Sequence, residues 1–184
     1  MRAMADPLPH LFTQYRPFDL LEKLKREKDR YDKARTRPCQ EDHIANFAAT
    51  AWNFHERLWE SIEALPPEER ERYANETGAD TNGPKEFRDW CKDQLPDLGG
   101  WRQITNTTKH FAKATDIGHD EVPVDVTARP TDSAAAASLI DIAQAENWSI
   151  EIKYLCDWVP AAEAMERVIA FWMRMMAYGK GFDL

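Results

Sequence analysis

The longest uninterrupted alternation of apolar and polar positions in the chain runs from residue 42 to residue 65. On a helix with about 100° per residue, its apolar side chains form one wide stripe, with Trp52 and Trp59 at the margin. The stripe consists of Ile44, Phe47, Ala48, Ala51, His55, Leu58 and Ile62. Neither Gly nor Pro interrupts the pattern before Pro66, so it predicts the central helix of a helical domain.

Helical spacing also appears on both sides of this segment. Phe18, Leu21, Leu24 and Tyr31 recur on a narrow stripe, which predicts a surface helix over 16–37 that Pro38 ends. Pro67 and Pro84 each suit the first position of a short helix, over about 67–75 and 84–95. Pro96 and the Gly99–Gly100 pair are expected to close the second of these, and a second core helix is expected over 101–115.

The period of the pattern changes after Gly118. Val122, Val124 and Val126 alternate with other residues, and alternation returns over 138–144 and 149–154. We expect a hairpin between the last two segments, with its turn at 145–147. The sequence then predicts a closing helix over 158–178, with Pro160 in its first turn.

These elements predict a mainly α fold, which is a helix bundle with a small antiparallel β insertion before the C-terminal helix. The insertion is expected over 120–155, and two or three strands are too few to organise the domain. At 184 residues the chain is long enough for one real core, so we expect residues 1–184 to form a single helical domain.

Charge is unevenly distributed along the chain. The formal net charge is −8, but residues 16–37 hold nine Lys and Arg against five Asp and Glu. A basic first helix on an acidic body is suited to contact nucleic acid or an acidic partner. The alternative interpretation is a solvated helix face.

Cysteine usage and hydropathy bear on the compartment. The three Cys are widely spaced and form no CxxC pair, which favours reduced thiols over a disulfide framework or a zinc ribbon. No apolar run approaches the roughly 20 residues of a membrane span, and the N-terminus lacks the apolar centre of a signal peptide. We therefore expect a cytoplasmic protein without a membrane partner.

The richest polar cluster lies in the predicted helix 101–115. Arg102, Asn106, His110 and Lys113 fall within a sector of about 80°, and Lys109 borders it. A cation that holds a phosphate, a His that titrates near neutrality and an orienting Asn can support phosphodiester chemistry. The alternative is the solvent-facing side of an amphipathic helix.

The helix NFAATAWNFHERLW, the segment DWCKDQLP and the following N-x-x-K-H helix resemble bacterial and phage proteins related to the HEPN superfamily. The resemblance spans about residues 40–115 and the strand–strand–helix ending. HEPN domains are helical bundles that commonly dimerise, and many are metal-independent ribonucleases of toxin–antitoxin and antiphage systems. Their signature is an Arg, an adjacent polar residue and a His after four to six intervening residues. Here seven residues separate Arg102 from His110.

The resemblance implies a homodimer in a stress or defence setting that cleaves RNA without cofactor or metal. His110 would be the acid/base, Asn106 the orienting group, and Arg102 or Lys109 the phosphate clamp. Many superfamily members lack catalysis, so the alternative is a dimerising module that binds an antitoxin, another partner protein or a small ligand.

His55 is the second candidate, because it falls on the apolar stripe of the central helix. A buried imidazole needs a hydrogen-bond partner, and a core His that has one is the simplest interpretation. The alternative is a metal-binding bundle built from His55, His110 and His119.

Overall fold

The structure is a computed structural model, and it describes residues 16–109, 126–130, 148–154 and 157–178. The helices are α1 (Pro17–Lys33), α2 (Arg37–Glu63), α3 (Pro67–Thr77), α4 (Pro84–Gln94), α5 (Asp97–Lys109) and α7 (Ala161–Tyr178). The strands are β1 (Val126–Pro130), β2 (Trp148–Tyr154) and β3 (Asp157–Pro160). This confirms a mainly α bundle with a small antiparallel sheet before the C-terminal helix. No helix among the described residues is long and apolar enough to cross a lipid bilayer.

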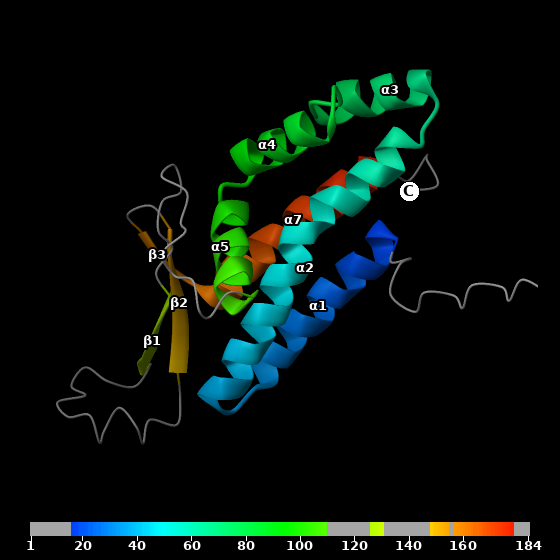
Figure 1. The fold of residues 1–184 in the computed structure, drawn as a ribbon. Helices are drawn as coiled ribbons and strands as arrows, with labels where there is room; N and C mark the ends of the chain where they lie inside the picture. Colours follow the sequence, from blue (N-terminus) through cyan, green and yellow to red (C-terminus); the bar gives the residue numbers. More distant parts are fainter. Residues whose placement is uncertain (1–15, 110–125, 131–147, 155–156, 179–184) are drawn as a thin grey trace, which may run out of the picture.

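The central helix of the bundle is α2, as the hydrophobic pattern predicts. It packs against α1, α4, α5 and α7, and Figure 1 shows α1 antiparallel beside it. Phe47, Ala51 and Leu58 on its stripe are fully buried. The Phe54 ring stacks on Trp172 of α7 with 4.5 Å between centroids. Aromatic and aliphatic contacts around α2 therefore form the core that holds the other helices.

The first boundary that the sequence misplaces is the start of α2. The helix begins at Arg37 rather than at residue 42, and Pro38 lies within its first turn. A Pro there lacks only an N–H that has no acceptor inside the helix, so it does not break the helix. The preceding helix α1 ends at Lys33, so the loop between them is short.

The start of α5 is the second correction. This helix begins at Asp97 and contains Gly99 and Gly100, which were expected to separate two helices. Each Gly inside a helix costs about 1 kcal/mol relative to Ala. Burial of Leu98 and Trp101, which are each 1% exposed, offsets that cost. The end of the predicted helix, residues 110–115, lies outside the described residues.

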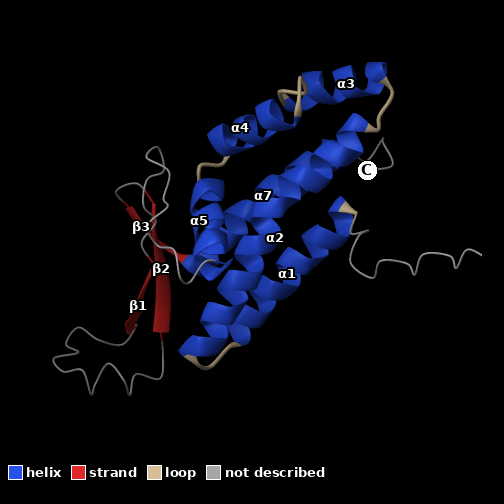
Figure 2. Cartoon of the chain, viewed as in Figure 1, coloured by secondary structure: helices blue, strands red, loops and turns tan. Residues whose placement is uncertain are grey.

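The sheet has the order β1-β2-β3, with both neighbouring pairs antiparallel. The predicted strand 149–154 is confirmed as most of β2, whereas Val122, Val124 and the predicted strand 138–144 with its turn lie outside the described residues. Ile150 and Ile152 of β2 are buried. Figure 2 shows the sheet at one end of the bundle, beyond α5.

The closing helix begins later than predicted. Residues 158–160 belong to β3, where Val159 pairs with Ile152 and Asp157 pairs with Tyr154. Pro160 ends this strand, and α7 begins at Ala161. In β3 the backbone N–H and C=O groups of residues 157–160 pair with β2, whereas the first N–H groups of a helix have no partner within the helix. This pairing overrides the helical pattern of the sequence.

Candidate functional site

The exposed side of α2 carries an uncharged surface in the middle of the helix. Apart from two histidines, no residue between Asp42 and Glu56 is charged or titratable. The solvent-facing positions of this segment are Ala45, Asn46, Ala49, Trp52 and Asn53, all exposed or half-buried. We call these five residues the α2 face. It is bounded by α1 on one edge and by α5 on the other.

The α5 edge combines aromatic rings with a cation. The Arg102 guanidinium lies 5.3 Å from the centroid of the Trp52 ring, and Trp52 in turn lies 4.7 Å from the ring of His55. A guanidinium at this distance from an indole is attracted by the ring quadrupole. Asn106 is exposed one helical turn beyond Arg102. Arg102 therefore borders the α2 face, and Asn106, the other described side chain of this sector, lies on the same side of α5.

His55 lies beneath this edge and is only 4% exposed. Its Nδ1 donates a hydrogen bond to the carbonyl oxygen of Trp52, which fixes the protonated nitrogen of the neutral ring. Burial lowers the pKa of His55, the Trp52 hydrogen bond opposes this, and the nearby Arg88 and Arg102 charges lower it further. The structure thus confirms a core histidine with a hydrogen-bond partner.

The alternative of a metal centre at His55 needs His110 and His119, which lie outside the described residues. Within the described ranges, no group of three or more His, Cys, Asp or Glu side chains is arranged to hold a metal ion.

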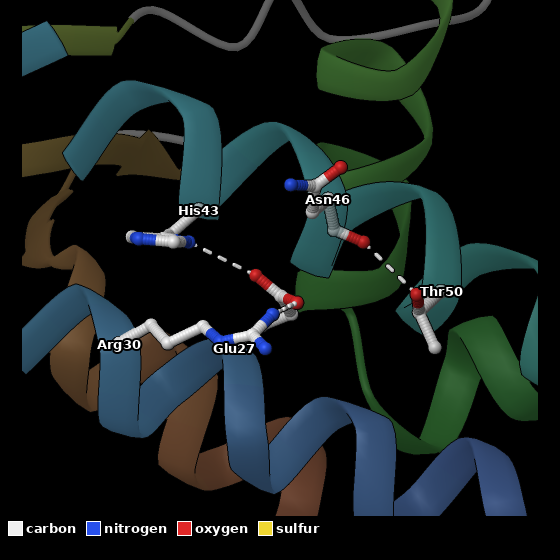
Figure 3. Close-up of polar contacts among 5 residues, drawn as sticks. All are labelled: Glu27, Arg30, His43, Asn46 and Thr50. Atoms are coloured by element: carbon white, nitrogen blue, oxygen red, sulfur yellow. Dashed lines mark hydrogen bonds and ion pairs between the residues drawn. The ribbon is translucent and has the colours of Figure 1, made fainter. Parts of the chain in front are cut away.

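The α1 edge is built around a buried carboxylate. The Glu27 side chain is 6% exposed, and its Oε2 lies 3.0 Å from Nδ1 of His43. Its other oxygen accepts a hydrogen bond of 2.7 Å from Arg30 Nη1. Figure 3 shows the His43 ring with Nδ1 toward Glu27 and the opposite ring edge turned away from it. Nδ1 donates to the carboxylate, so Nε2 is the nitrogen left to meet a ligand.

This Glu27–His43 pair is the part of the site that sequence reasoning missed. Glu27 stands at core spacing on α1, three residues after Leu24 and four before Tyr31, which are both buried. A carboxylate at such a position must be paired or hydrogen-bonded when the helix packs. The signal was therefore a charged residue inside an apolar stripe.

A small cavity lies where α5 and α7 meet the sheet. It is lined by Asp97, Trp101, Ile152, Val159 and Ala164, and its volume of about 10 Å³ accommodates a single water. Burial raises the pKa of the Asp97 carboxyl, while Arg167 lowers it. The Asp97 Oδ2 atom has no hydrogen-bond partner. The cavity fits a structural water and is too small for a substrate.

The predicted catalytic residues are thus only partly described. Arg102 is half-buried and Asn106 is exposed on the same side of α5, whereas Lys109 ends the helix and its side chain is not described. His110 and Lys113 lie outside the described residues, so their distances to Arg102 stay predictions.

Comparison of the chain with protein-family models, curated proteins and solved structures finds no match. The resemblance to HEPN proteins therefore stays a prediction.

Proposed function

We propose that this protein is a HEPN-like, metal-independent ribonuclease of a bacterial or phage stress or defence system, with RNA bound across the α2 face. The observation that supports it is the pairing, on one side of α5, of an exposed Asn106 with Arg102 one turn away. Stacking on Trp52 restrains the Arg102 guanidinium, which reduces the entropy lost when it binds a phosphate.

The α2 face suits single-stranded RNA for two further reasons. A chain of net charge −8 repels a polyanion, but the five residues of this face carry no carboxylate, and the nearest acids of α2 on the same side, Asp42 and Glu56, stand at its two ends. Trp52 is half-buried and offers an aromatic surface near the Arg102 cation. Base stacking on aromatic side chains contributes about 1–3 kcal/mol per base and tolerates any sequence.

The chemistry needs no metal, because the RNA itself supplies the nucleophile. A base removes the proton of a 2′-hydroxyl, the 2′-oxygen attacks phosphorus, and the bond to the 5′-oxygen breaks. The products are a 2′,3′-cyclic phosphate and a 5′-hydroxyl, whose proton comes from the protonated acid/base group. In the proposal His110 is the acid/base that transfers the proton, Asn106 is the orienting group, and Arg102 or Lys109 holds the phosphate oxygens.

The test is incubation of the purified protein with total RNA in EDTA, beside the His110→Ala and Asn106→Ala variants. We expect cleavage by the wild type, none by His110→Ala, and a reduced rate for Asn106→Ala. Asn75→Ala is the matched control, because Asn75 is exposed on α3, away from this face. Equal cleavage by the wild type and His110→Ala, or none by either, refutes the assigned roles.

A second candidate function is a non-catalytic dimerising module for an antitoxin or another partner protein. The observation that favours it is a group of exposed apolar side chains where α1 begins and α7 ends. Phe18 is 57% exposed, Met173 47% and Tyr178 40%. Figure 1 shows these helix ends at the same end of the bundle. For this function, sedimentation should show a dimer that Phe18→Ser with Met173→Ser converts to monomer, and His110→Ala should change nothing.

A further inference from the structure

The basic first helix carries more positive charge than its own carboxylates neutralise. Within α1, Glu22 pairs with Lys25, Asp29 with Lys33, and Asp32 with Lys28. Glu27 pairs with Arg30, and the remaining acid, Asp19, accepts from the backbone N–H of Arg16. No ion pair is found in the described structure for the side chains of Arg16, Lys23 and Arg26, which are exposed or half-buried. The local excess of positive charge is therefore displayed to solvent.

These cations share one side of the helix. At about 100° per residue, Arg16, Lys23, Arg26 and Arg30 fall within a sector of about 80°, and the one carboxylate in this sector is Asp19. Two contacts show which way this sector points. Glu27 contacts His43 of α2 and lies about 20° beyond the margin of this cationic sector. Lys28 pairs with Glu166 of α7 and lies on the opposite side of the buried stripe of α1. The cationic sector therefore adjoins the α2 edge of α1.

His43 extends this sector onto α2. Its side chain is 24% exposed, and the hydrogen bond to the buried Glu27 carboxylate holds the ring in one orientation. Arg30, bound to the other oxygen of that carboxylate, remains 58% exposed. Asp42 is the neighbouring acid on α2, and it lies about 100° round the helix from His43, on the side of the α2 face.

We propose that Lys23, Arg26, Arg30 and His43 form a second phosphate-binding site, which holds the backbone of single-stranded RNA at the α1 edge of the α2 face. The inference rests on the proposed function, since it gives the same RNA a contact on the side of α2 opposite Arg102. His43 and Trp52 are nine residues apart, which places them about 180° apart around α2. A strand that crosses the α2 face thus meets cations at both edges.

The experiment measures binding of a labelled 2′-O-methyl RNA oligonucleotide over a series of salt concentrations. This probe keeps the phosphates but lacks the 2′-hydroxyl nucleophile, so binding is measured without cleavage. The test variant is Lys23→Gln with Arg26→Gln. The matched control is Lys92→Gln with Arg174→Gln, which removes the same charge from α4 and α7, where both side chains lack an ion pair in the described structure.

The slope of log K against log salt is negative, and loss of two phosphate contacts should make it less steep by about 1.4, because each contact to single-stranded nucleic acid contributes about −0.7. The control should keep the wild-type slope. Equal slopes for the test variant and wild type, or equal losses in both double variants, overturn the inference. Cleavage of total RNA in EDTA tests the proposed function separately. If the protein binds RNA through these cations but does not cleave it, the phosphate-binding site is supported and the nuclease function is refuted.

A second measurement addresses His43 directly. Titration with inorganic phosphate, followed by NMR of the imidazole resonances, should shift His43 saturably and leave the buried His55 unchanged. The Lys23→Gln, Arg26→Gln variant should need several-fold more phosphate for the same shift. Absence of any His43 shift removes His43 from the site.

Discussion

The two edges of α2 hold one histidine each, and the two rings meet opposite surroundings. At the α1 edge, His43 bonds a carboxylate from a neighbouring helix and keeps one ring edge in solvent. At the α5 edge, His55 bonds a carbonyl of its own helix and is buried beneath Trp52. Burial lowers the pKa of His55 and so favours its neutral ring. One helix therefore presents an electrostatic edge and an aromatic one.

This difference indicates which kind of perturbation should affect each edge. The α1 edge depends on charge pairing between two helices, so removing one partner should loosen their contact. The α5 edge depends on ring packing and a neutral imidazole, so it should respond to pH and to changes of volume. Both edges depend on the buried stripe of α2 that lies behind them.

The largest expected effect comes from that stripe. Ala51 is fully buried, and Ala51→Asp would place an unpaired carboxylate in the core. We expect the folded state to be lost, or the free energy of unfolding to fall by more than about 3 kcal/mol. Ala49→Asp is the control, because Ala49 is only half-buried on the α2 face. Urea unfolding followed by circular dichroism measures both, and an unchanged midpoint for Ala51→Asp would show that α2 is not the core helix.

The next effect should come from the α1 edge. Glu27→Ala removes the acceptor of both His43 and Arg30 at a position where the side chain is 6% exposed. We expect a loss of about 2 kcal/mol in the free energy of unfolding, since each hydrogen bond involves a charged group. Glu22→Ala removes an exposed partner of Lys25 and should stay within about 0.5 kcal/mol. Equal losses for the two variants would mean that the buried Glu27–His43 pair stabilises the fold no more than an exposed ion pair does.

The next prediction concerns the α5 edge and the dependence of the free energy of unfolding on pH. The pKa of His55 is lower in the folded state, so the unfolded chain binds more protons and stability falls as pH drops below the unfolded value. As the pH falls through the ordinary pKa of a histidine, about 6.5, the wild type should lose more of its free energy of unfolding than His55→Gln. Asp97, whose pKa is raised, acts in the opposite direction at lower pH and is common to both proteins. Parallel stability curves for the two would contradict a neutral, buried His55.

Most helices could be predicted because their apolar stripes correspond to buried faces. Ile44, Phe47 and Leu58 were assigned to the core from spacing alone, and all are buried. The errors lie where tertiary contacts outweigh local signals. Gly99–Gly100 reads as a helix end, yet burial of Leu98 and Trp101 keeps the helix continuous. Pairing with β2 likewise turns residues 157–160 into a strand.

The candidate site was less predictable than the fold. The sector with Arg102 and Asn106 follows from helix periodicity, so sequence reasoning found it. The Glu27–His43 pair joins residues 16 positions apart on two helices, and their contact depends on how α1 packs on α2. Neither partner matches a motif. The one signal in the sequence is that Glu27, a charged residue, stands within the apolar stripe of α1. That signal predicts a buried carboxylate but does not identify His43 as its partner.

The smallest expected effect concerns the thiols, and it separates the two edges without perturbing either. A reducing agent should leave the melting temperature unchanged, because Cys39 is a free, exposed thiol and Cys91 a free, buried one. Burial raises the pKa of the Cys91 thiol, so a thiol reagent should modify it only after unfolding.

In a Cys156→Ser background, native labelling should therefore be confined to Cys39, which lies one turn before His43 on α2. RNA bound at the α1 edge should slow that labelling, and RNA bound only at the α5 edge should not, so the protection of a single thiol distinguishes the two.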